Sequence, residues 1–120
     1  MGAFIAIKEN TDFRTAYYRG KSQVHPLLVT YVRRNRLGVT RVGITAGKKV
    51  GKAVRRNRCR RIIRAAYQAL QPEVRCGYDI VFVARVRTGS STSTQVQAAM
   101  QAQLRALGVY GPGGKGGCST

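Results

Sequence analysis

The sequence predicts an α+β fold, a single-domain α-β sandwich whose elements follow the order α-β-β-β-α-β-α. Three observations lead to this fold class. The chain has 120 residues, 43% of them apolar, so it can bury one hydrophobic core. Its apolar residues follow helical spacing in three stretches and form β-rich runs in four others. Gly and Pro residues separate these stretches, and the sequence has no internal repeat.

The first predicted helix covers residues 10–19. Asn10 or Thr11 can cap its N-terminus, because both side chains accept hydrogen bonds from free backbone N–H groups. Gly20 is a natural stop for the helix. Residues 1–9, which precede it, carry little structural signal.

Three strands are predicted next. Residues 21–26 form a short edge strand that ends at Pro26, because proline cannot donate to a sheet ladder. Residues 27–34 and 39–46 are β-rich, and the basic turn between them allows these two strands to pair antiparallel. Gly47 then ends the third strand.

Residues 48–69 predict a long amphipathic helix, with Pro72 just beyond its end. At about 100° per residue, its apolar side chains gather on one side and can pack on a core. That side consists of Cys59, Ile62, Ile63, Ala66 and Leu70. The opposite side consists of Asn57, Arg60, Arg61, Arg64 and Gln68.

The last two elements are a strand over residues 79–87 and a helix that ends at Gly108. The strand is almost continuously apolar, as expected of a strand that is covered on both faces and parallel to an earlier one. Thr92 and Gln95 have the spacing of a capping box at the start of the helix. Its apolar stripe consists of Val96, Met100, Leu104 and Leu107.

The net charge indicates an anionic partner. The chain carries 22 basic and four acidic residues, a net charge of +18, and 16 of the basic residues are arginine. Such self-repulsion is typical of a protein that binds a polyanion. Guanidinium groups form bidentate hydrogen bonds with phosphates and stack on bases, so nucleic acid is the first candidate. A membrane surface fits less well, because no basic helix carries the bulky apolar face of an interfacial helix. With no apolar run near 18 residues and no signal-peptide layout, we expect a cytoplasmic protein with no membrane partner.

The positive charge is concentrated in residues 48–64, where nine of 17 residues are Lys or Arg and none is acidic. A solvated helix face is the ordinary interpretation of such a run. Solvated faces usually mix signs, however, because Glu–Lys pairs four residues apart stabilise a helix. A face of one sign instead predicts a binding surface whose anionic partner relieves the repulsion.

Aromatic residues accompany the charge and favour single-stranded RNA. Phe13, Tyr17, Tyr31 and Tyr110 can each pack in the core or offer a ring on which an unpaired base stacks. No short partner helix precedes the basic helix, as a helix-turn-helix would require, so we expect no DNA partner.

The acidic residues argue against hydrolytic chemistry within the chain. A two-metal nuclease needs several carboxylates that converge on one point. Glu9, Asp12, Glu73 and Asp79 lie in separate segments, and His25 is the single histidine. We therefore expect no catalytic residue in this chain, and the sequence assigns no protein-bound metal site.

Three motifs in the basic stretch together resemble the signature of the bacterial ribonuclease P protein component. They are residues 48–54 (KKVGKAV), 56–58 (RNR) and 60–64 (RRIIR). The resemblance extends in order and with few gaps over about residues 8–110. The flanks that agree are Asp12-Phe13, Gly20-Lys21, the strand around Tyr31, residues 41–44 (RVGI) and residues 77–81 (GYDIV).

The resemblance implies both a fold and a function. The family fold is an α-β sandwich with a left-handed β-α-β crossover around the basic helix, an exception to the usual handedness. Family members bind a large catalytic RNA, and the complex removes the 5′ leader of precursor tRNA by Mg²⁺-dependent hydrolysis that the RNA carries out. We therefore expect residues 1–110 to form a single RNA-binding domain, followed by a flexible Gly-rich tail over residues 111–120.

Carried onto this sequence, the resemblance assigns two sets of binding residues. The set for the catalytic RNA is Lys49, Lys52, Arg56, Asn57, Arg58, Arg60, Arg61 and Arg64. The set for the precursor tRNA leader, in a cleft between the first helix and the sheet, is Phe13, Tyr17, Tyr31 and Tyr110.

Two alternatives belong to other functional classes. One is a structural RNA-binding protein such as a ribosomal component, which composition alone does not separate from a ribonuclease P subunit. The other is a self-sufficient nuclease. The ordered signature argues against the first, and the scattered carboxylates argue against the second.

Overall fold

Strand β5 (Tyr78–Ala84) lies at the centre of the fold, between strands from different parts of the chain. The structure is a computed structural model that describes residues 5–7 and 10–110. Within these residues the sheet has the order β1-β4-β5-β3-β2. β5 pairs parallel with β4 (Arg41–Thr45) and antiparallel with β3 (Leu28–Arg34). This central place explains its continuous apolar sequence, because a central strand between helices is covered on both faces.

The antiparallel pairing predicted between residues 27–34 and 39–46 is wrong, because β5 lies between these two strands. A strand with apolar side chains on both faces buries more apolar area at the centre of a sheet than at its edge. β5 therefore lies at the centre, with β4 on one side and β3 on the other. At the two edges, β2 (Lys21–Val24) pairs antiparallel with β3, and β1 (Ile5–Ala6) pairs parallel with β4. The sequence did not predict β1, since two residues are too few to show a strand period.

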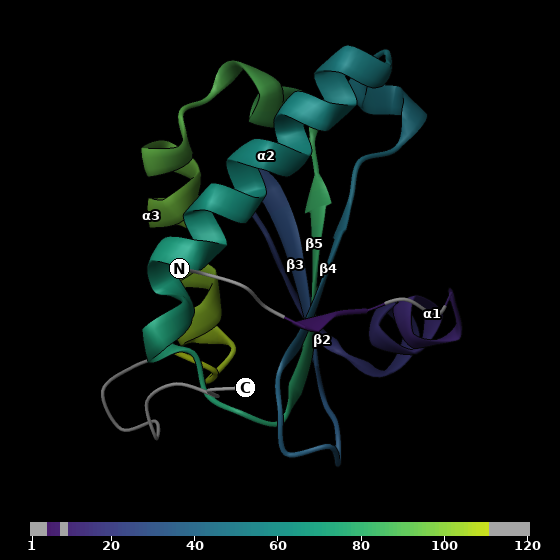
Figure 1. The fold of residues 1–120 in the computed structure, drawn as a ribbon, viewed down its shortest axis with the longest axis vertical. Helices are drawn as coiled ribbons and strands as arrows, with labels where there is room; N and C mark the ends of the chain where they lie inside the picture. The colour runs from purple at the N-terminus through teal and green to yellow at the C-terminus, as the bar shows by residue number, and fades with distance from the viewer. Residues whose placement is uncertain (1–4, 8–9, 111–120) are drawn as a thin grey trace.

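Helices cover the two faces of the sheet unequally. α1 (Asn10–Arg19) lies on one face, and α2 (Ala53–Leu70) and α3 (Ser93–Ala106) lie together on the other (Figure 1). The predicted element order is confirmed from α1 onward. The β4-α2-β5 unit is a crossover between parallel neighbours, as predicted, and its left hand stays an expectation from the family resemblance.

Helix α2 begins later than predicted. Residues Lys48–Val50 form a separate 3-10 turn, η1, and Gly51 follows with a φ of 144°. Only glycine adopts this backbone conformation readily, so the chain cannot run through it as one helix. Lys52 is extended and serves as the N-cap residue of α2. The other end agrees with the prediction, since the 3-10 turn η2 (Gln71–Glu73) follows Leu70 directly.

β5 also ends earlier than predicted, at Ala84, and the 3-10 segment η3 (Val86–Ser90) leads toward α3. Thr88 explains this change, because its hydroxyl oxygen accepts the backbone N–H of Arg85 at 2.9 Å. The same hydroxyl donates to the carbonyl oxygen of Leu27. The chain is thereby tied back onto the start of β3 instead of extending the strand.

The predicted capping box of α3 is confirmed. The backbone N–H of Gln95 donates to Thr92 Oγ1 at 3.2 Å, and the backbone N–H of Thr92 donates to Gln95 Oε1 at 3.0 Å. Gly108, with a φ of 79°, follows the end of the helix, as predicted.

The main hydrophobic core lies between the sheet and the α2/α3 layer. It includes Ile80 and Phe82 of β5 and Ile63 and Tyr67 of α2, and the rings of Tyr67 and Phe82 lie 5.6 Å apart. Burial raises the pKa of the Tyr67 hydroxyl above its ordinary value, because the ionised form would lose its hydration. Burial also raises the pKa of the Cys59 thiol, against the opposing charges of nearby arginines.

A second, smaller core lies under α1. Its buried residues are Ile7, Ala16 and Val81, and Phe13, Tyr31 and Val83 pack against it while partly exposed. Most residues of the main core are buried, whereas half of those in the smaller core are partly exposed, so the α1 face of the sheet is partly open.

Candidate nucleic-acid interface

The outer face of α2 carries the cationic surface that the helical period predicted. Cys59, Ile63, Ala66 and Leu70 are buried, which turns the opposite side of the helix to solvent. That side forms a hollow of about 500 Å³, which we call the outer hollow. It is lined by Val54, Asn57, Arg60, Arg61 and Arg64.

The charges of the outer hollow are not neutralised within the described part of the chain. Its guanidinium groups form no ion pair with residues 5–7 or 10–110. Arg60 Nη1 donates to Asn57 Oδ1 at 3.0 Å, which orients one polar side chain against the other. Like charges on neighbouring turns repel each other. A polyanion that binds this surface relieves the repulsion, which lowers the free energy of the complex.

Two arginines on the flanks of α2 are held by the loops beside it. Arg56 Nε donates to the carbonyl oxygen of Ala46 at 3.2 Å, and Arg58 Nε donates to the carbonyl oxygen of Gly89 at 2.7 Å. Both residues belong to the predicted RNA-binding set. A guanidinium has five N–H donors, so each keeps its Nη groups for a further acceptor. These bonds fix the direction in which the two charges point.

Sequence reasoning missed Arg55, which has a similar position. Its Nη2 donates to the carbonyl oxygen of Val86 at 3.0 Å, and its guanidinium lies within 3.1–3.3 Å of where a Cβ on Gly89 would be. The available signal was spacing, because Arg55 lies four residues before the buried Cys59 and therefore shares its face of the helix. An arginine on the apolar side of an amphipathic helix needs acceptors from a neighbouring segment, and η3 supplies one.

The two predicted lysines lie at the N-terminal end of the same surface. Lys49 is exposed on η1, which the buried side chain of Val50 anchors to the core. Lys52 is exposed at the N-cap of α2. The structure thus brings the whole predicted RNA-binding set to α2 and the turn before it.

Three of the four predicted leader-binding rings meet on the partly open face of the sheet. The rings of Tyr17 from α1 and Tyr31 from β3 lie edge to face, with centroids 4.9 Å apart and planes at 74°. Tyr17 is 39% exposed, whereas Phe13 is more enclosed. A Cβ added to Gly43 would lie 2.4 Å from a carbon of the Phe13 ring, so this ring packs directly on the β4 backbone.

Tyr110 does not join this group. It forms an isolated antiparallel bridge with Val74 and packs against the main core on the α2/α3 side. The guanidinium of Arg105 lies 5.6 Å from its ring centroid. The resemblance placed Tyr110 with the other rings, but the chain after α3 turns back along η2, away from α1. Its inclusion in the leader-binding set is therefore not supported by its position.

Comparisons with known proteins identify the family. The family model described as Ribonuclease P matches residues 1–108 of the chain. The chain belongs to the ribonuclease P protein family. A ribonuclease P protein component of Clostridium botulinum (strain Loch Maree / Type A3) is 39% identical over 105 residues, which cover 87% of this chain and 95% of that protein. One of Clostridioides difficile (strain 630) is 42% identical over 96 residues, which cover 79% and 84%.

Solved structures of ribonuclease P proteins agree with the fold described above. The protein from Staphylococcus aureus superposes with a TM-score of 0.77 at 30% identity and covers 91% of this chain and all of that one. The protein from Thermotoga maritima superposes with a TM-score of 0.72 at 26% identity, covering 85% and 94%. tRNA processing and RNA binding are the functions with which this family is associated.

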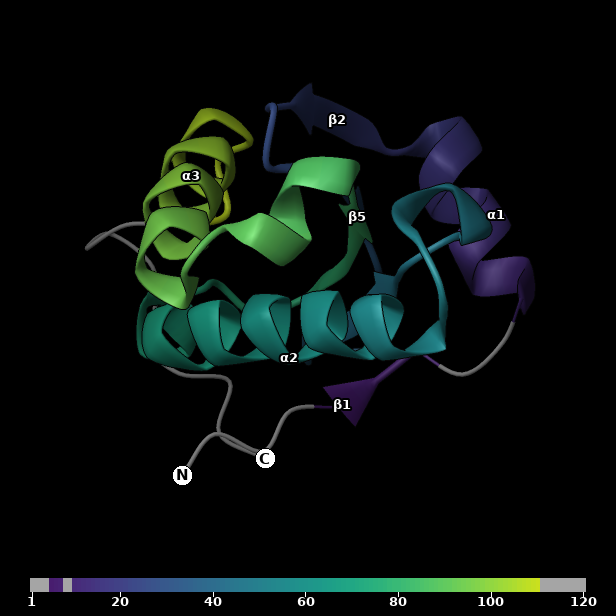
Figure 2. The same cartoon turned by 90° about the horizontal axis from the view of Figure 1, so that it is seen from above.

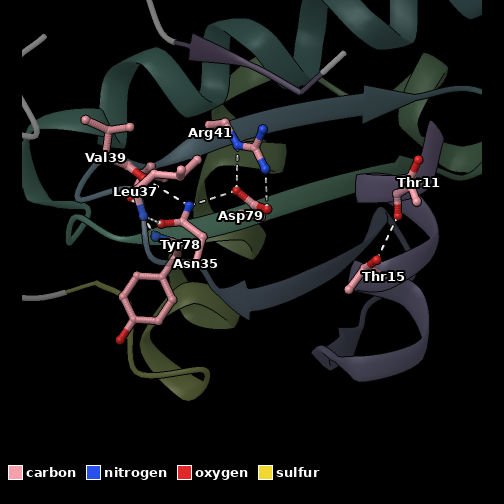
Figure 3. A network of polar contacts seen from close by, with 9 residues as sticks. Thr11, Thr15, Asn35, Leu37, Val39, Arg41, Tyr78 and Asp79 are labelled. Carbon is pink, nitrogen blue, oxygen red and sulfur yellow. Dashed lines mark hydrogen bonds and ion pairs between the residues drawn. The ribbon is translucent and has the colours of Figure 1, made fainter. Parts of the chain in front are cut away.

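Of the carboxylates that the structure describes in this chain, the one of Asp79 has a structural position. Asp79 is 1% exposed and accepts Arg41 Nε at 2.9 Å, Arg41 Nη2 at 2.8 Å and Asn35 Nδ2 at 2.8 Å (Figure 3). Asn35 also holds the loop after β3, donating to Val39 and accepting the backbone N–H of Leu37. Glu73 is exposed on η2. Glu9 and the side chain of Asp12 lie outside the described part.

Two further observations concern groups of metal-binding side chains and the length and polarity of the helices. Within residues 5–7 and 10–110, no group of three His, Cys, Asp or Glu side chains lies close enough together to hold a metal ion. In the same residues, every helix is too short or too polar to cross a bilayer. The predicted Gly-rich tail, residues 111–120, lies outside the described part of the chain.

Proposed function

We propose that this chain is the protein subunit of a ribonuclease P ribonucleoprotein and binds its catalytic RNA with the outer face of α2. The observation that carries the proposal is the outer hollow, where Arg60, Arg61 and Arg64 share one rigid helix face without carboxylate partners in the described chain. Guanidinium groups match phosphate oxygens in geometry and charge. Lys49, Lys52 and the free Nη groups of Arg56 and Arg58 extend the surface at its N-terminal end and flanks.

We further propose that the partly open face of the sheet binds the 5′ leader of precursor tRNA. An unpaired base has a π-face that stacks on an aromatic ring regardless of sequence. Tyr17 and Tyr31 offer such rings next to the smaller core, and Phe13 packs against the same core. The leader site proposed here is Phe13, Tyr17 and Tyr31, without Tyr110.

In this proposal the catalytic RNA carries out the hydrolysis. Mg²⁺ bound to the RNA would supply an activated water and stabilise the charge of the reacting phosphate. The chain's own residues bind and orient: α2 neutralises phosphates of the catalytic RNA, and the ring pair holds the leader. Neutralising the repulsion between two polyanions favours their association most when Mg²⁺ is scarce.

The test is cleavage of precursor tRNA at low Mg²⁺ by the chain alone, by a ribonuclease P RNA alone, and by both together. We expect cleavage at the 5′ end of the mature tRNA only when both are present. Turnover by the chain alone would instead identify a self-sufficient nuclease. Tight RNA binding without any stimulation of cleavage would favour a structural RNA-binding protein, such as a ribosomal component.

A further inference from the structure

A second hollow lies on the other side of Arg61, between α2 and the start of α3. It has a volume of about 340 Å³ and is lined by α2 on one side and residues 91–93 on the other. The α2 wall consists of Arg58, Arg61, Ile62 and Ala65. Figure 2 shows the chain after β5 running alongside α2 before it enters α3.

The positive charges of this second hollow come from two guanidiniums with different supports. Arg58 is fixed by the bond from its Nε to the carbonyl oxygen of Gly89, which leaves its Nη groups as donors. Arg61 is exposed and forms no hydrogen bond or ion pair with the described residues. The residues that line this hollow include no carboxylate.

The hydroxyl groups on the opposite wall are not equivalent. Ser91 Oγ donates to the carbonyl oxygen of Arg87 at 2.8 Å, so its proton is already used. Thr92 Oγ1 accepts the backbone N–H of Gln95 in the capping box and keeps its own proton. Ser93 is partly exposed, and its hydroxyl makes no hydrogen bond within the described chain. The hollow therefore presents two guanidiniums and two hydroxyl donors to one small space.

We propose that this second hollow binds one backbone phosphate of the RNA partner, in addition to the phosphates on the outer face of α2. Charge-assisted hydrogen bonds from arginine, combined with hydroxyl donors, are the contacts that a phosphate oxygen prefers. Arg61 lines both hollows, so an RNA strand that crosses α2 at this residue contacts both. This inference rests on the proposed RNA binding and adds η3 and the start of α3 to the interface.

The test compares two substitutions that each add one negative charge to α3. Ser93→Glu places a carboxylate on the wall of the second hollow, and a glutamate in the first turn of a helix is well tolerated. Ala102→Glu is the matched control, because it is exposed on the same helix about 13 Å further along the axis, beyond the screening length at physiological salt. Arg64→Ala, which removes a charge from the outer hollow alone, reports on the proposed function itself.

The measurement is the affinity of each full-length variant for a ribonuclease P RNA across a series of salt concentrations, with thermal unfolding to confirm equal folding. We expect Ser93→Glu to weaken binding about 5- to 10-fold and to lower the salt slope by about one unit, as loss of one phosphate contact does. Ala102→Glu should change affinity less than about 2-fold.

The outcomes separate the two ideas. Equal effects of Ser93→Glu and Ala102→Glu, with Arg64→Ala still weakening binding, would overturn the second hollow and leave the α2 interface intact. If the parent chain binds without salt dependence and Arg64→Ala changes nothing, the proposed RNA interface fails as a whole.

Discussion

The two faces of the sheet differ in how completely they are covered, although the same strand runs through both. On the α2/α3 face, Ile80 and Phe82 of β5 are fully buried in the large core. On the α1 face, Val81 is fully buried, but Val83 is only partly covered. Because successive side chains of a strand point to opposite faces of the sheet, neighbouring residues of β5 differ in how fully they are buried.

From this difference we infer that the α2/α3 face of the sheet mainly stabilises the fold and that the α1 face is available for binding. A sealed core excludes water and supplies most of the folding free energy. A partly covered sheet with exposed ring edges keeps apolar area that a ligand can bury. α2 packs on the main core of the α2/α3 face, which we call the closed face. This packed core holds the cationic surface of α2 in place. Four substitutions test this division, from the largest expected effect to the smallest.

Phe82→Ala should have the largest effect on stability. It removes a fully buried ring from the closed face and the contact with Tyr67, so we expect a loss of about 3–5 kcal/mol in the free energy of unfolding. Val83→Ala, at the next position on the open face, should cost only about 1 kcal/mol. Chemical denaturation monitored by circular dichroism measures both. Similar losses at the two positions would remove the distinction between the faces.

Asp79→Ala should have the next largest effect. Asp79 is the second residue of β5, on the same face of the sheet as Val81 and Val83. Its carboxylate is hydrogen-bonded to Arg41 and Asn35. The substitution leaves the guanidinium of Arg41 and the amide of Asn35 without their shared acceptor, and we expect a loss of about 2–4 kcal/mol. Denaturant titration gives the value. Glu73→Ala is the control, because its exposed side chain should contribute less than about 0.5 kcal/mol.

The features that sequence predicted well are those set by local spacing. The buried and exposed sides of α2 follow from a period of 3.6 residues, and the α3 capping box follows from the spacing of Thr92 and Gln95. The position of β5 between β3 and β4 did not follow, since strand order depends on which strand buries most area in the assembled fold. The break at Gly51 was hidden because a positive φ leaves no periodic signal.

The candidate site divides in the same way. Charge density and helical phase were enough to predict Arg60, Arg61 and Arg64 on one face. The bonds that fix Arg55 and Arg58 were not predictable, because their acceptors are carbonyl oxygens of η3, about 30 residues away. The sequence also did not show that Tyr110 lies apart from the other three rings, because the side of the sheet to which the segment after α3 returns depends on the assembled fold.

Gly43→Ala should reduce both stability and leader binding by moderate amounts. A Cβ at this position would lie 2.4 Å from the Phe13 ring, so the ring and α1 must move away from the sheet. Overpacking of this kind costs about 1–3 kcal/mol. The displaced α1 should also separate Tyr17 from Tyr31 and weaken binding of leader-bearing substrate. Denaturation and substrate affinity together check this prediction, and Gly47→Ala, where a Cβ meets open space, is the control.

Tyr17→Ala should have the smallest effect on stability and a clear effect on binding. Because Tyr17 is 39% exposed and its ring packs edge to face with that of Tyr31, we expect less than about 1 kcal/mol of lost stability. If an unpaired base stacks on this ring, affinity for leader-bearing precursor tRNA should fall by about 1–3 kcal/mol, while affinity for mature tRNA is unchanged.

The matched control for Tyr17 is its neighbour. Tyr18 is 87% exposed and lies about 100° further round the helix, so Tyr18→Ala removes an equally large ring from the same segment without changing the ring pair. Binding of both tRNA forms to the ribonucleoprotein, measured at one salt concentration, separates the two positions. If Tyr17→Ala lowered the affinity for leader-bearing and mature tRNA equally, the ring would contribute to packing and not to leader binding. The proposed leader site on the open face would then be wrong.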